Sequence, residues 1–352
     1  MSSPPAQRFC KGHTPPTPPM TVGGLKIVPA REFRGDLLEP LANLRATLRE
    51  RGEGLPPDWP SVTEQALRLG KLLGWVASDP AESARGMALL ALRGKRGFGQ
   101  VHLWQGLDPR RDGIDLLQAL LTSLPPEVGR LDLSVSSDPD PLEQSLTDAL
   151  ATSPLPFEII TRHSMGCTLD PAHPPSPPPL PEGFRFVPAL AFKPQLLATL
   201  DFQAFLGGPD AGMVAETPQD NLRLIEGLLQ GDLGPPIREA SPALFMERAG
   251  PEAQLVGFAL ALEDNPHRAL IADVAVSPDF RRMGLGKALL VRALRGLIAL
   301  GFTEVLLWVT DANVAAQALY KSTGFIPLRS GHILRWTRKD AAERPPSPSP
   351  SS

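Results

Sequence analysis

Cysteine is scarce and long apolar runs are missing in this sequence, which argues against a disulfide-stabilised fold and against a membrane-spanning segment. The only two cysteines, Cys10 and Cys167, lie far apart and form no metal-ligand spacing. This favours free thiols in an intracellular protein over a disulfide scaffold. No apolar run reaches the ~18 residues of a membrane span, and no signal-peptide apolar region follows Met1. We therefore expect a cytoplasmic protein without a membrane partner.

The sequence also lacks a large excess of positive or negative charge, with 35 lysines and arginines against 38 aspartates and glutamates. The net charge is -3 and the pI is about 6.1, so bulk attraction to nucleic acid is not expected. The chain has 352 residues, of which 42% are apolar, so it is long enough for two domains with a core each.

Proline is abundant, and most of the 41 prolines mark boundaries. The run from Pro171 to Pro181 favours an extended spacer, because proline cannot continue a helix or a central strand. The predicted organisation is listed here in chain order: a disordered lead (1–20), a first domain (21–170), a proline-rich linker (171–182), a second domain (183–339) and a disordered tail (340–352).

Apolar periodicity predicts one order of elements in both halves. In the first half it predicts strands at 25–29, 87–92, 99–104 and 130–135, helices at 37–48, 62–75, 114–124 and 142–151, and a strand pair at 157–169. In the second half it predicts strands at 184–188, 244–248, 255–262, 269–276, 304–309 and 333–337, and helices at 194–205, 218–230, from the loop at 281–287 to 300, and 314–321. The three strands between 244 and 276 are expected to be antiparallel.

The two halves also share residues around one loop. Residues 108–117, which contain Arg110 and Arg111, align with residues 279–288, which contain Arg281 and Arg282. An apolar helix and a short strand follow each segment, which indicates two copies of one fold.

The loop from Arg281 to Lys287 lies between a predicted strand and a predicted helix and contains Gly284 and Gly286. The first N–H groups of a helix have no internal partner, and glycine lets a ligand approach the backbone, so this pattern predicts an anion site. A nucleotide-triphosphate loop is excluded because the earlier glycine position holds Arg281 and Ala288 follows the lysine. A dinucleotide turn is disfavoured because Leu289 replaces the third glycine.

The loop resembles the pyrophosphate loop of GNAT-type N-acetyltransferases, whose pattern is [QR]-x-x-G-x-[GA] after a strand. Residues 313–325 resemble the N-x-x-A-x-x-L-Y-x-x-x-G-F segment of the same family, in the expected order and separation. The resemblance covers 183–339 well and 21–170 faintly. It implies an α+β fold of two tandem GNAT-like domains, mycothiol synthase-like in architecture, each a mixed and mostly antiparallel sheet flanked by helices.

The resemblance also implies acetyl-CoA as the co-substrate, without a metal. The residues expected to bind it are Val274, Ala275, Val276, Arg281, Arg282, Met283, Gly284, Leu285, Gly286, Lys287, Asn313 and Ala316. Two alternatives stay open: the arginines as solvated loop residues, and Asn313 as a helix cap instead of a ligand contact.

Tyr320, the only tyrosine in the chain, stands where the family places the acid that protonates the CoA thiolate. Packing at a helix end is the alternative. Asp273 is the nearest candidate for the general base, although strand alternation leaves open which face it occupies. Some members carry a carboxylate where this chain has Trp308, which weakens a likeness to enzymes that acetylate protein N-termini.

The first copy departs from the motif. Asp115 replaces the second glycine, Asp112 adds a further carboxylate, and this half has no tyrosine. Carboxylates beside a phosphate repel it, so we expect this domain to be non-catalytic. The main hypothesis is transfer of an acetyl group to a primary amine of a small molecule or peptide, by direct attack in a ternary complex. The alternative is a sensor or scaffold that binds acyl-CoA without turnover.

Overall fold

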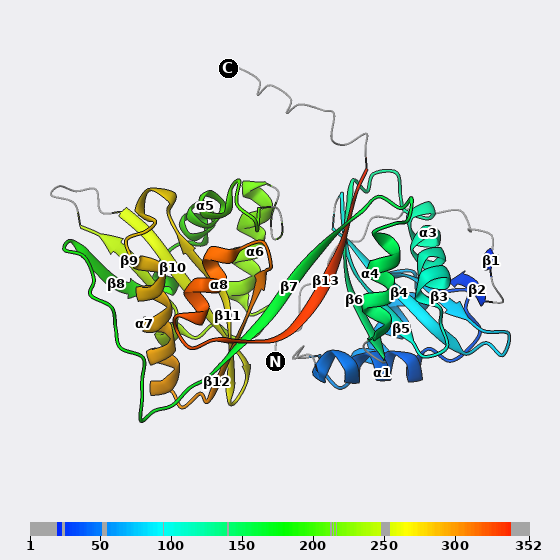
Figure 1. Ribbon diagram of the computed structural model, residues 1–352, viewed down its shortest axis with the longest axis horizontal. Helices are drawn as coiled ribbons and strands as arrows, with labels where there is room; N and C mark the ends of the chain where they lie inside the picture. Colours follow the sequence, from blue (N-terminus) through cyan, green and yellow to red (C-terminus); the bar gives the residue numbers. More distant parts are fainter. Residues whose placement is uncertain are drawn as a thin grey trace, which may run out of the picture. The chain divides into compact units, whose positions relative to one another are not determined.

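The computed structural model describes residues 20–22, 25–50, 55–93, 95–138, 141–211, 213, 215, 217–247 and 254–338 (Figure 1). Residues 1–19 of the lead predicted at 1–20, and the tail predicted at 340–352, lie outside these residues, whereas Met20 begins a strand. The chain forms two compact units, one of residues 1–160 and 331–352 and one of residues 161–330. The predicted division at the proline-rich segment differs from this one, because each unit includes a strand from the other half of the sequence. In the described part, no helix is long and apolar enough to cross a membrane.

The first unit is a mixed sheet in the order β1-β2-β3-β4-β5-β6-β13, with helices packed on it. Its elements are β1 (Met20–Val22), β2 (Leu25–Pro29), α1 (Leu38–Glu50), α2 (Trp59–Arg68), β3 (Leu73–Ser78), β4 (Ala84–Arg93), β5 (Arg96–Trp104), a π-helical turn (Pro109–Gly113), α3 (Ile114–Thr122), β6 (Arg130–Asp138), α4 (Pro141–Leu150) and the end of β13 (Ile326–Thr337). All pairs are antiparallel except β5 with β6.

The second unit repeats this order in the sheet β7-β12-β11-β10-β9-β8, in which only β11 and β12 are parallel. Its elements are β7 (Phe157–Thr168), β8 (Phe184–Pro188), α5 (Pro194–Phe205), α6 (Pro218–Gln230), β9 (Pro242–Met246), β10 (Gln254–Asn265), β11 (Arg268–Val276), α7 (Leu285–Ala299), β12 (Glu304–Thr310) and α8 (Val314–Lys321). The α+β class expected from the resemblance is confirmed.

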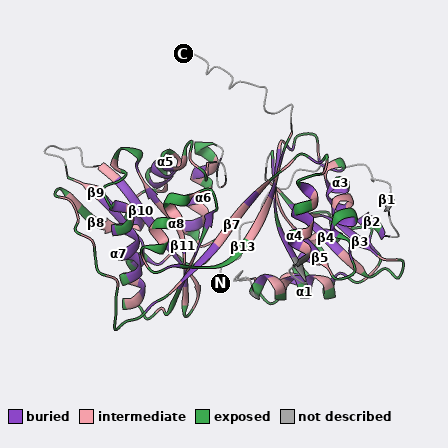
Figure 2. Cartoon of the chain, in the orientation of Figure 1, coloured by how far each residue is buried: buried purple, intermediate pink, exposed green. Residues whose placement is uncertain are grey.

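Helices cover both faces of the second sheet. Leu290, Leu294 and Leu297 of α7 join a buried cluster with β12 on one face, and α5 and α6 form another cluster with Phe258 and Leu260 on the opposite face. In Figure 2 the buried positions of α7 follow the side turned to the sheet. Alternation along β11 therefore directs successive side chains to two different helix layers.

Two predicted elements were wrong. The helix expected at 62–75 ends at Arg68, where Gly70 at φ 66 breaks it, and Leu73–Ser78 forms β3. This strand is almost wholly buried, so it lacks the alternation that marks a half-exposed strand. The strand pair expected at 157–169 is the single strand β7.

Candidate functional site

The site begins where β11 and β12 separate. These parallel strands pair only from Arg268 to Leu270, opposite Glu304 to Leu306. Beyond that point β11 pairs with β10 alone, and a bulge at Ala272 shifts the register between Ile271 and Asp273. The other edge of β11, up to Val276, therefore presents N–H and C=O groups that an extended ligand can pair with, as a further strand would.

The loop after β11 leads directly into the start of α7. Gly284 caps this helix at φ 78, and a Cβ built on it meets no atom within 4 Å. The first helical bond is donated by Ala288 to the Gly284 carbonyl at 3.0 Å. In the described ranges, no backbone acceptor pairs with the N–H groups from Arg282 to Lys287. Free N–H groups, open space and the positive end of the helix dipole together suit a phosphate group.

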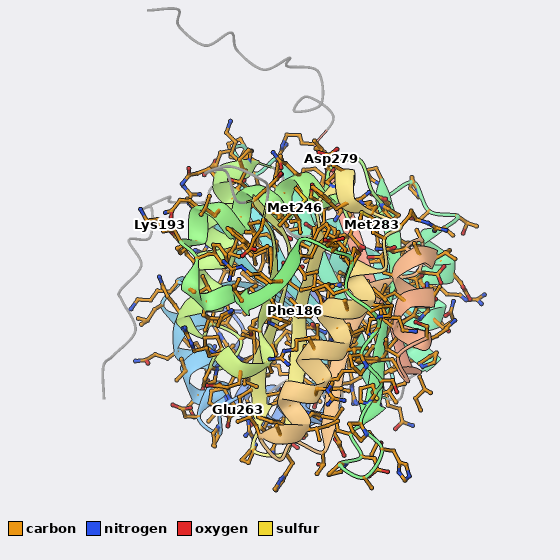
Figure 3. The ribbon with its side chains drawn as sticks, turned by 90° about the vertical axis from the view of Figure 1, so that its left-hand side faces the viewer. Phe186, Lys193, Met246, Glu263, Asp279 and Met283 are labelled. Atoms are coloured by element: carbon orange, nitrogen blue, oxygen red, sulfur yellow. The ribbon has the colours of Figure 1, made fainter. Side chains whose placement is uncertain are left out.

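The charged side chains of the loop divide into two kinds. Arg281 donates a hydrogen bond to the Ala204 carbonyl at the end of α5, so its guanidinium holds the loop against that helix. Arg282 and Lys287 are exposed and free to approach an anion. Arg282 also has φ 66, a conformation that is costly for a residue with a side chain. Figure 3 shows Met283 at this end of the unit.

The second motif segment forms α8, which packs beside the loop. Leu319 is the nearest neighbour of Gly286, 3.4 Å from a Cβ built there. Asn313 caps α8 by accepting from the Ala316 N–H at 3.0 Å, and its Nδ2 donates to Asp210 Oδ2 at 2.6 Å. Both ends of this amide are therefore used within the protein, and its predicted contact with the co-substrate stays a prediction.

Tyr320 lies near the end of α8 and is partly buried against Phe325, with ring centroids 5.9 Å apart. Burial raises the pKa of its phenol well above its ordinary value, with smaller contributions from Asp273 and Asp210, whereas Arg162 opposes the shift. The phenol is consequently protonated at neutral pH. A protonated hydroxyl close to two carboxylates can act as a proton donor.

Asp273 points to the face of the sheet that α5 covers. It pairs in register with Leu260, a member of the α5 cluster, while Val274 and Val276 pack toward α7. Its carboxyl hydrogen-bonds that of Asp201, and burial together with this neighbour raises the pKa of Asp273 well above the ordinary range. Two adjacent buried carboxyls share a proton, because both cannot ionise cheaply.

Asp201 is held in this pair by a second polar contact. It is 3% exposed, and Asn221 Nδ2 donates to its Oδ2 at 2.9 Å. Its other oxygen, Oδ1, is shielded from solvent without a fixed donor, so a proton on Asp273 supplies the missing hydrogen bond. A carboxyl with a raised pKa is a better match for a general base near neutral pH than an exposed one.

Sequence reasoning missed three charged residues of this region: Asp201, Asp210 and Arg162. Asp201 could have been recognised from the sequence, because it lies four residues after Leu197 and therefore on the apolar face of α5. A lone carboxylate on such a face has to find a partner. The other two carried none, because Asp210 lies in a connection and Arg162 in a strand with no distinctive pattern.

The corresponding turn of the first unit is filled by its own side chains. Asp112 is 3% exposed, accepts the Asp108 N–H at 3.0 Å and binds Arg111 at 2.8 Å. Burial and Asp112 raise the pKa of Asp115. The turn that corresponds to the proposed anion site therefore carries two carboxyl groups of its own.

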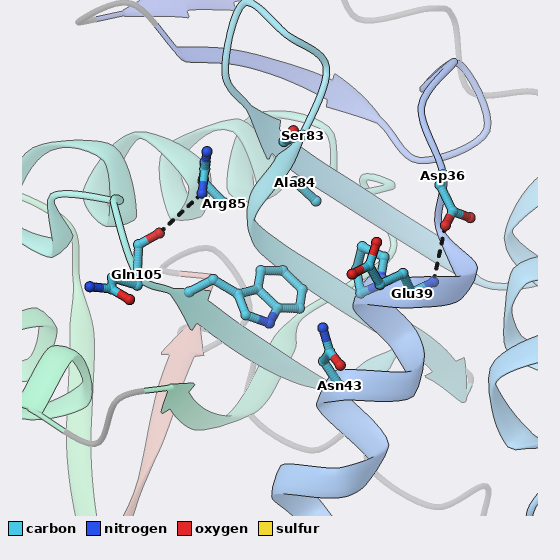
Figure 4. A pocket seen from close by; sticks show the side chains of 9 residues that line it. Asp36, Glu39, Asn43, Ser83, Ala84, Arg85 and Gln105 are labelled. Atoms are coloured by element: carbon cyan, nitrogen blue, oxygen red, sulfur yellow. Dashed lines mark hydrogen bonds between the residues drawn. The ribbon is translucent and has the colours of Figure 1, made fainter.

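The first unit contains a polar cavity of about 400 Å³ between α1 and the ends of β4 and β5 (Figure 4). Asp36, at its rim, is used to cap α1, and Arg85 donates to the Gln105 carbonyl and to Asp79. Among the described residues, no group of three or more His, Cys, Asp or Glu could hold a metal ion.

Comparison with known proteins relates the residues of this site to a protein family. Residues 217–325, which contain the split strands, the loop and α8, match the model of the acetyltransferase (GNAT) family. These 109 residues, within the second unit, are therefore similar to a GNAT acetyltransferase domain. A mycothiol acetyltransferase of Thermobispora bispora is 34% identical over 168 residues, which are 46% of this chain and 50% of that protein. The chain thus spans half the length of this relative.

Two solved structures share the fold over most of the chain. A GCN5-related N-acetyltransferase of Sphaerobacter thermophilus has a TM-score of 0.58 at 19% identity, covering 88% of this chain and 95% of that one. A tandem GNAT protein from the clavulanic acid biosynthesis pathway has a TM-score of 0.51 at 16% identity, covering 89% and 98%. At such identities the likeness shows the fold alone, and it extends over both units of the chain.

Proposed function

We propose that the second unit is an acetyl-CoA-dependent N-acetyltransferase acting on a primary amine. One observation carries the proposal: the unpaired edge of β11 leads straight to a helix start with free N–H groups. An extended pantetheine arm along Val274 to Val276 would place its pyrophosphate at Arg282 to Lys287. Main-chain groups would supply both sets of contacts, with Arg282 and Lys287 adding charge.

In this arrangement two proton transfers are needed, one to the departing sulfur and one from the attacking amine, and different side chains carry them out. The amine nitrogen attacks the thioester carbonyl carbon, the C–S bond breaks, and the sulfur leaves as a thiolate. Tyr320, whose phenol is neutral at working pH, gives its proton to that sulfur. Asp273 and Asp201 together hold one proton and one negative charge, and this pair accepts the proton that the amine loses. No covalent enzyme intermediate is needed.

The first unit is proposed to be non-catalytic. Asp115 stands where the second unit has Gly286, and Asp112 stands where it has Met283. Both carboxylates would repel a phosphate. This half also has no tyrosine to serve as the acid. Its contribution would then be to structure, because its core includes the last strand of the chain.

The test is acetyl transfer to a panel of primary amines, followed as thiol release and by the mass of the acetylated product. The matched variant is Gly286→Asp, which gives the second unit the carboxylate that Asp115 has in the first. We expect wild type to bind acetyl-CoA and to acetylate at least one amine class, and the variant to lose binding by more than about 10-fold, since a like charge faces the phosphates. Equal affinity in both proteins would reject this loop as the anion site.

A further inference from the structure

Arg162 lies on the same side of the second unit as Asp273. Arg162 pairs in register with Thr310, at the point where the pairing of β7 with β12 ends. Met165 and Cys167 of β7 pack into the cluster beneath α7 and α8, so alternation directs Arg162 to the opposite face of the sheet. That is the face on which Asp273 meets Asp201. The strand that carries Arg162 also enters this unit from the N-terminal half of the sequence.

The guanidinium of Arg162 is not neutralised by a direct contact. Its Nε is shielded from solvent and has no hydrogen-bond partner. Within the described ranges, no carboxylate lies within ion-pair distance of it, whereas other half-buried arginines such as Arg96 and Arg335 bind Asp132 directly. Burial also lowers the pKa of Arg162, although the group stays charged. A desolvated charge without a partner is costly to keep, and such groups concentrate at binding sites.

Among the described residues, the carboxylate that interacts electrostatically with Arg162 is Asp210, and it is already engaged. Thr310 Oγ1 donates to its Oδ1 and Asn313 Nδ2 donates to its Oδ2 at 2.6 Å. Asp210 therefore acts on Arg162 only through space, as does the Tyr320 phenol. The free guanidinium thus lies close enough to the proposed proton donor to interact with it, and it is on the face of the sheet that carries the proposed base, Asp273.

We propose that Arg162 binds a carboxylate carried by the acceptor, so that the substrate is an amine with a nearby carboxyl group, as in a free amino acid. This rests on the proposed function and names its substrate class. Arginine binds a carboxylate through two parallel N–H···O bonds, which fixes the orientation of the whole molecule. With the carboxylate on Arg162 and the amine toward Asp273, the nitrogen is directed at the thioester.

The experiment compares pairs of acceptors that differ in one group, such as glycine with glycinamide and alanine with alaninamide. In wild type we expect kcat/KM for the acid to exceed that for the amide by about 10- to 100-fold, the size of one charge-assisted hydrogen-bonding pair. This comparison needs no variant. An amide acetylated as fast as its acid would overturn the inference and leave the proposed function intact.

Variants then assign the preference to Arg162. Arg162→Met is expected to reduce the acid-to-amide ratio to near one, and Arg162→Lys to retain part of the ratio. Arg292→Met, an exposed arginine on α7, is the matched control and should keep the wild-type ratio. An unchanged ratio in Arg162→Met would also overturn the inference.

Binding separates this inference from failure of the proposed function. If neither acceptor class is acetylated, calorimetry of the acids and amides is carried out on the protein saturated with CoA. Binding of the acids alone, lost in Arg162→Met, would support the carboxylate site without the chemistry. No binding of either class would overturn it.

Discussion

At the scale of single residues, the phenol of Tyr320 is the group whose role can be isolated best. Phenylalanine at this position keeps the ring against Phe325 and removes only the hydroxyl group that donates the proton. We expect Tyr320→Phe to lower kcat by about 100-fold, the usual contribution of one general acid, with little change in acetyl-CoA affinity. Steady-state kinetics and calorimetry measure the two quantities. Equal turnover of both proteins across a broad pH range would remove Tyr320 from the chemistry.

The carboxyl pair of Asp273 and Asp201 makes a prediction about stability. Because the pKa of Asp273 is raised in the folded protein, its contribution to stability is fully present below pH 3.8, the ordinary value, where both states are protonated. As pH rises past that value the unfolded carboxyl ionises first, so the free energy of unfolding falls until the folded carboxyl ionises as well. The loss is about 1.4 kcal/mol per pH unit across that window.

Asp273→Asn removes this titration. We expect the free energy of unfolding of the variant to fall less than that of wild type between acid and neutral pH, and the control Asp279→Asn, at an exposed loop position, to follow wild type. Urea unfolding at a series of pH values measures both. Parallel curves for wild type and Asp273→Asn would show that Asp273 is not buried as a protonated acid.

The sequence predicts part of this site and misses the rest for a physical reason. Arg282, Gly284 and Tyr320 belong to local patterns, because the loop and helix that position them are continuous in the chain. Arg162 and Asp210 meet only because β7 pairs with β12 and the connection after α5 reaches Thr310. No spacing along the chain records such contacts.

At the scale of elements, the two glycines at the start of α7 have different reasons to be glycine. Gly284 has φ 78, so Gly284→Ala should cost about 1 kcal/mol through strain, although space is open around it. Gly286 lies inside the helix, and a Cβ there meets Leu319 at an ordinary 3.4 Å. Gly286→Ala should therefore be neutral or stabilising by up to about 1 kcal/mol.

Chemical denaturation of the two variants measures the change in the free energy of unfolding, which we expect to be a loss for Gly284→Ala and no loss for Gly286→Ala. Equal destabilisation would mean that packing against Leu319 outweighs helix propensity at Gly286.

The element scale is also where sequence patterns work best, since amphipathic helices such as 218–230 are predicted with the right bounds. They fail at β3, which is buried on both faces and therefore loses its alternation.

At the scale of the whole molecule, the exchange of strands is the feature that no sequence pattern could predict. Apolar alternation identifies β7 and β13 as strands, but it says nothing about their partners. β7 follows the first half in sequence and pairs with β12, whereas the end of β13 follows the second half and pairs with β6. The proline-rich segment after β7 therefore divides the sequence at a point where the fold is not divided.

This exchange predicts that core mutations act on the unit that is distant in sequence. Leu334 is fully buried in the core of the first unit, and Met165 is 1% exposed in the core of the second. Truncation of either to alanine should cost about 2–5 kcal/mol. Hydrogen exchange of Leu334→Ala should show lost protection in α3 and β6 with β10 and β11 unchanged, and Met165→Ala should show lost protection in α7 and β12. If each variant instead loosened the half of the sequence that contains it, the strand pairing described here would be wrong.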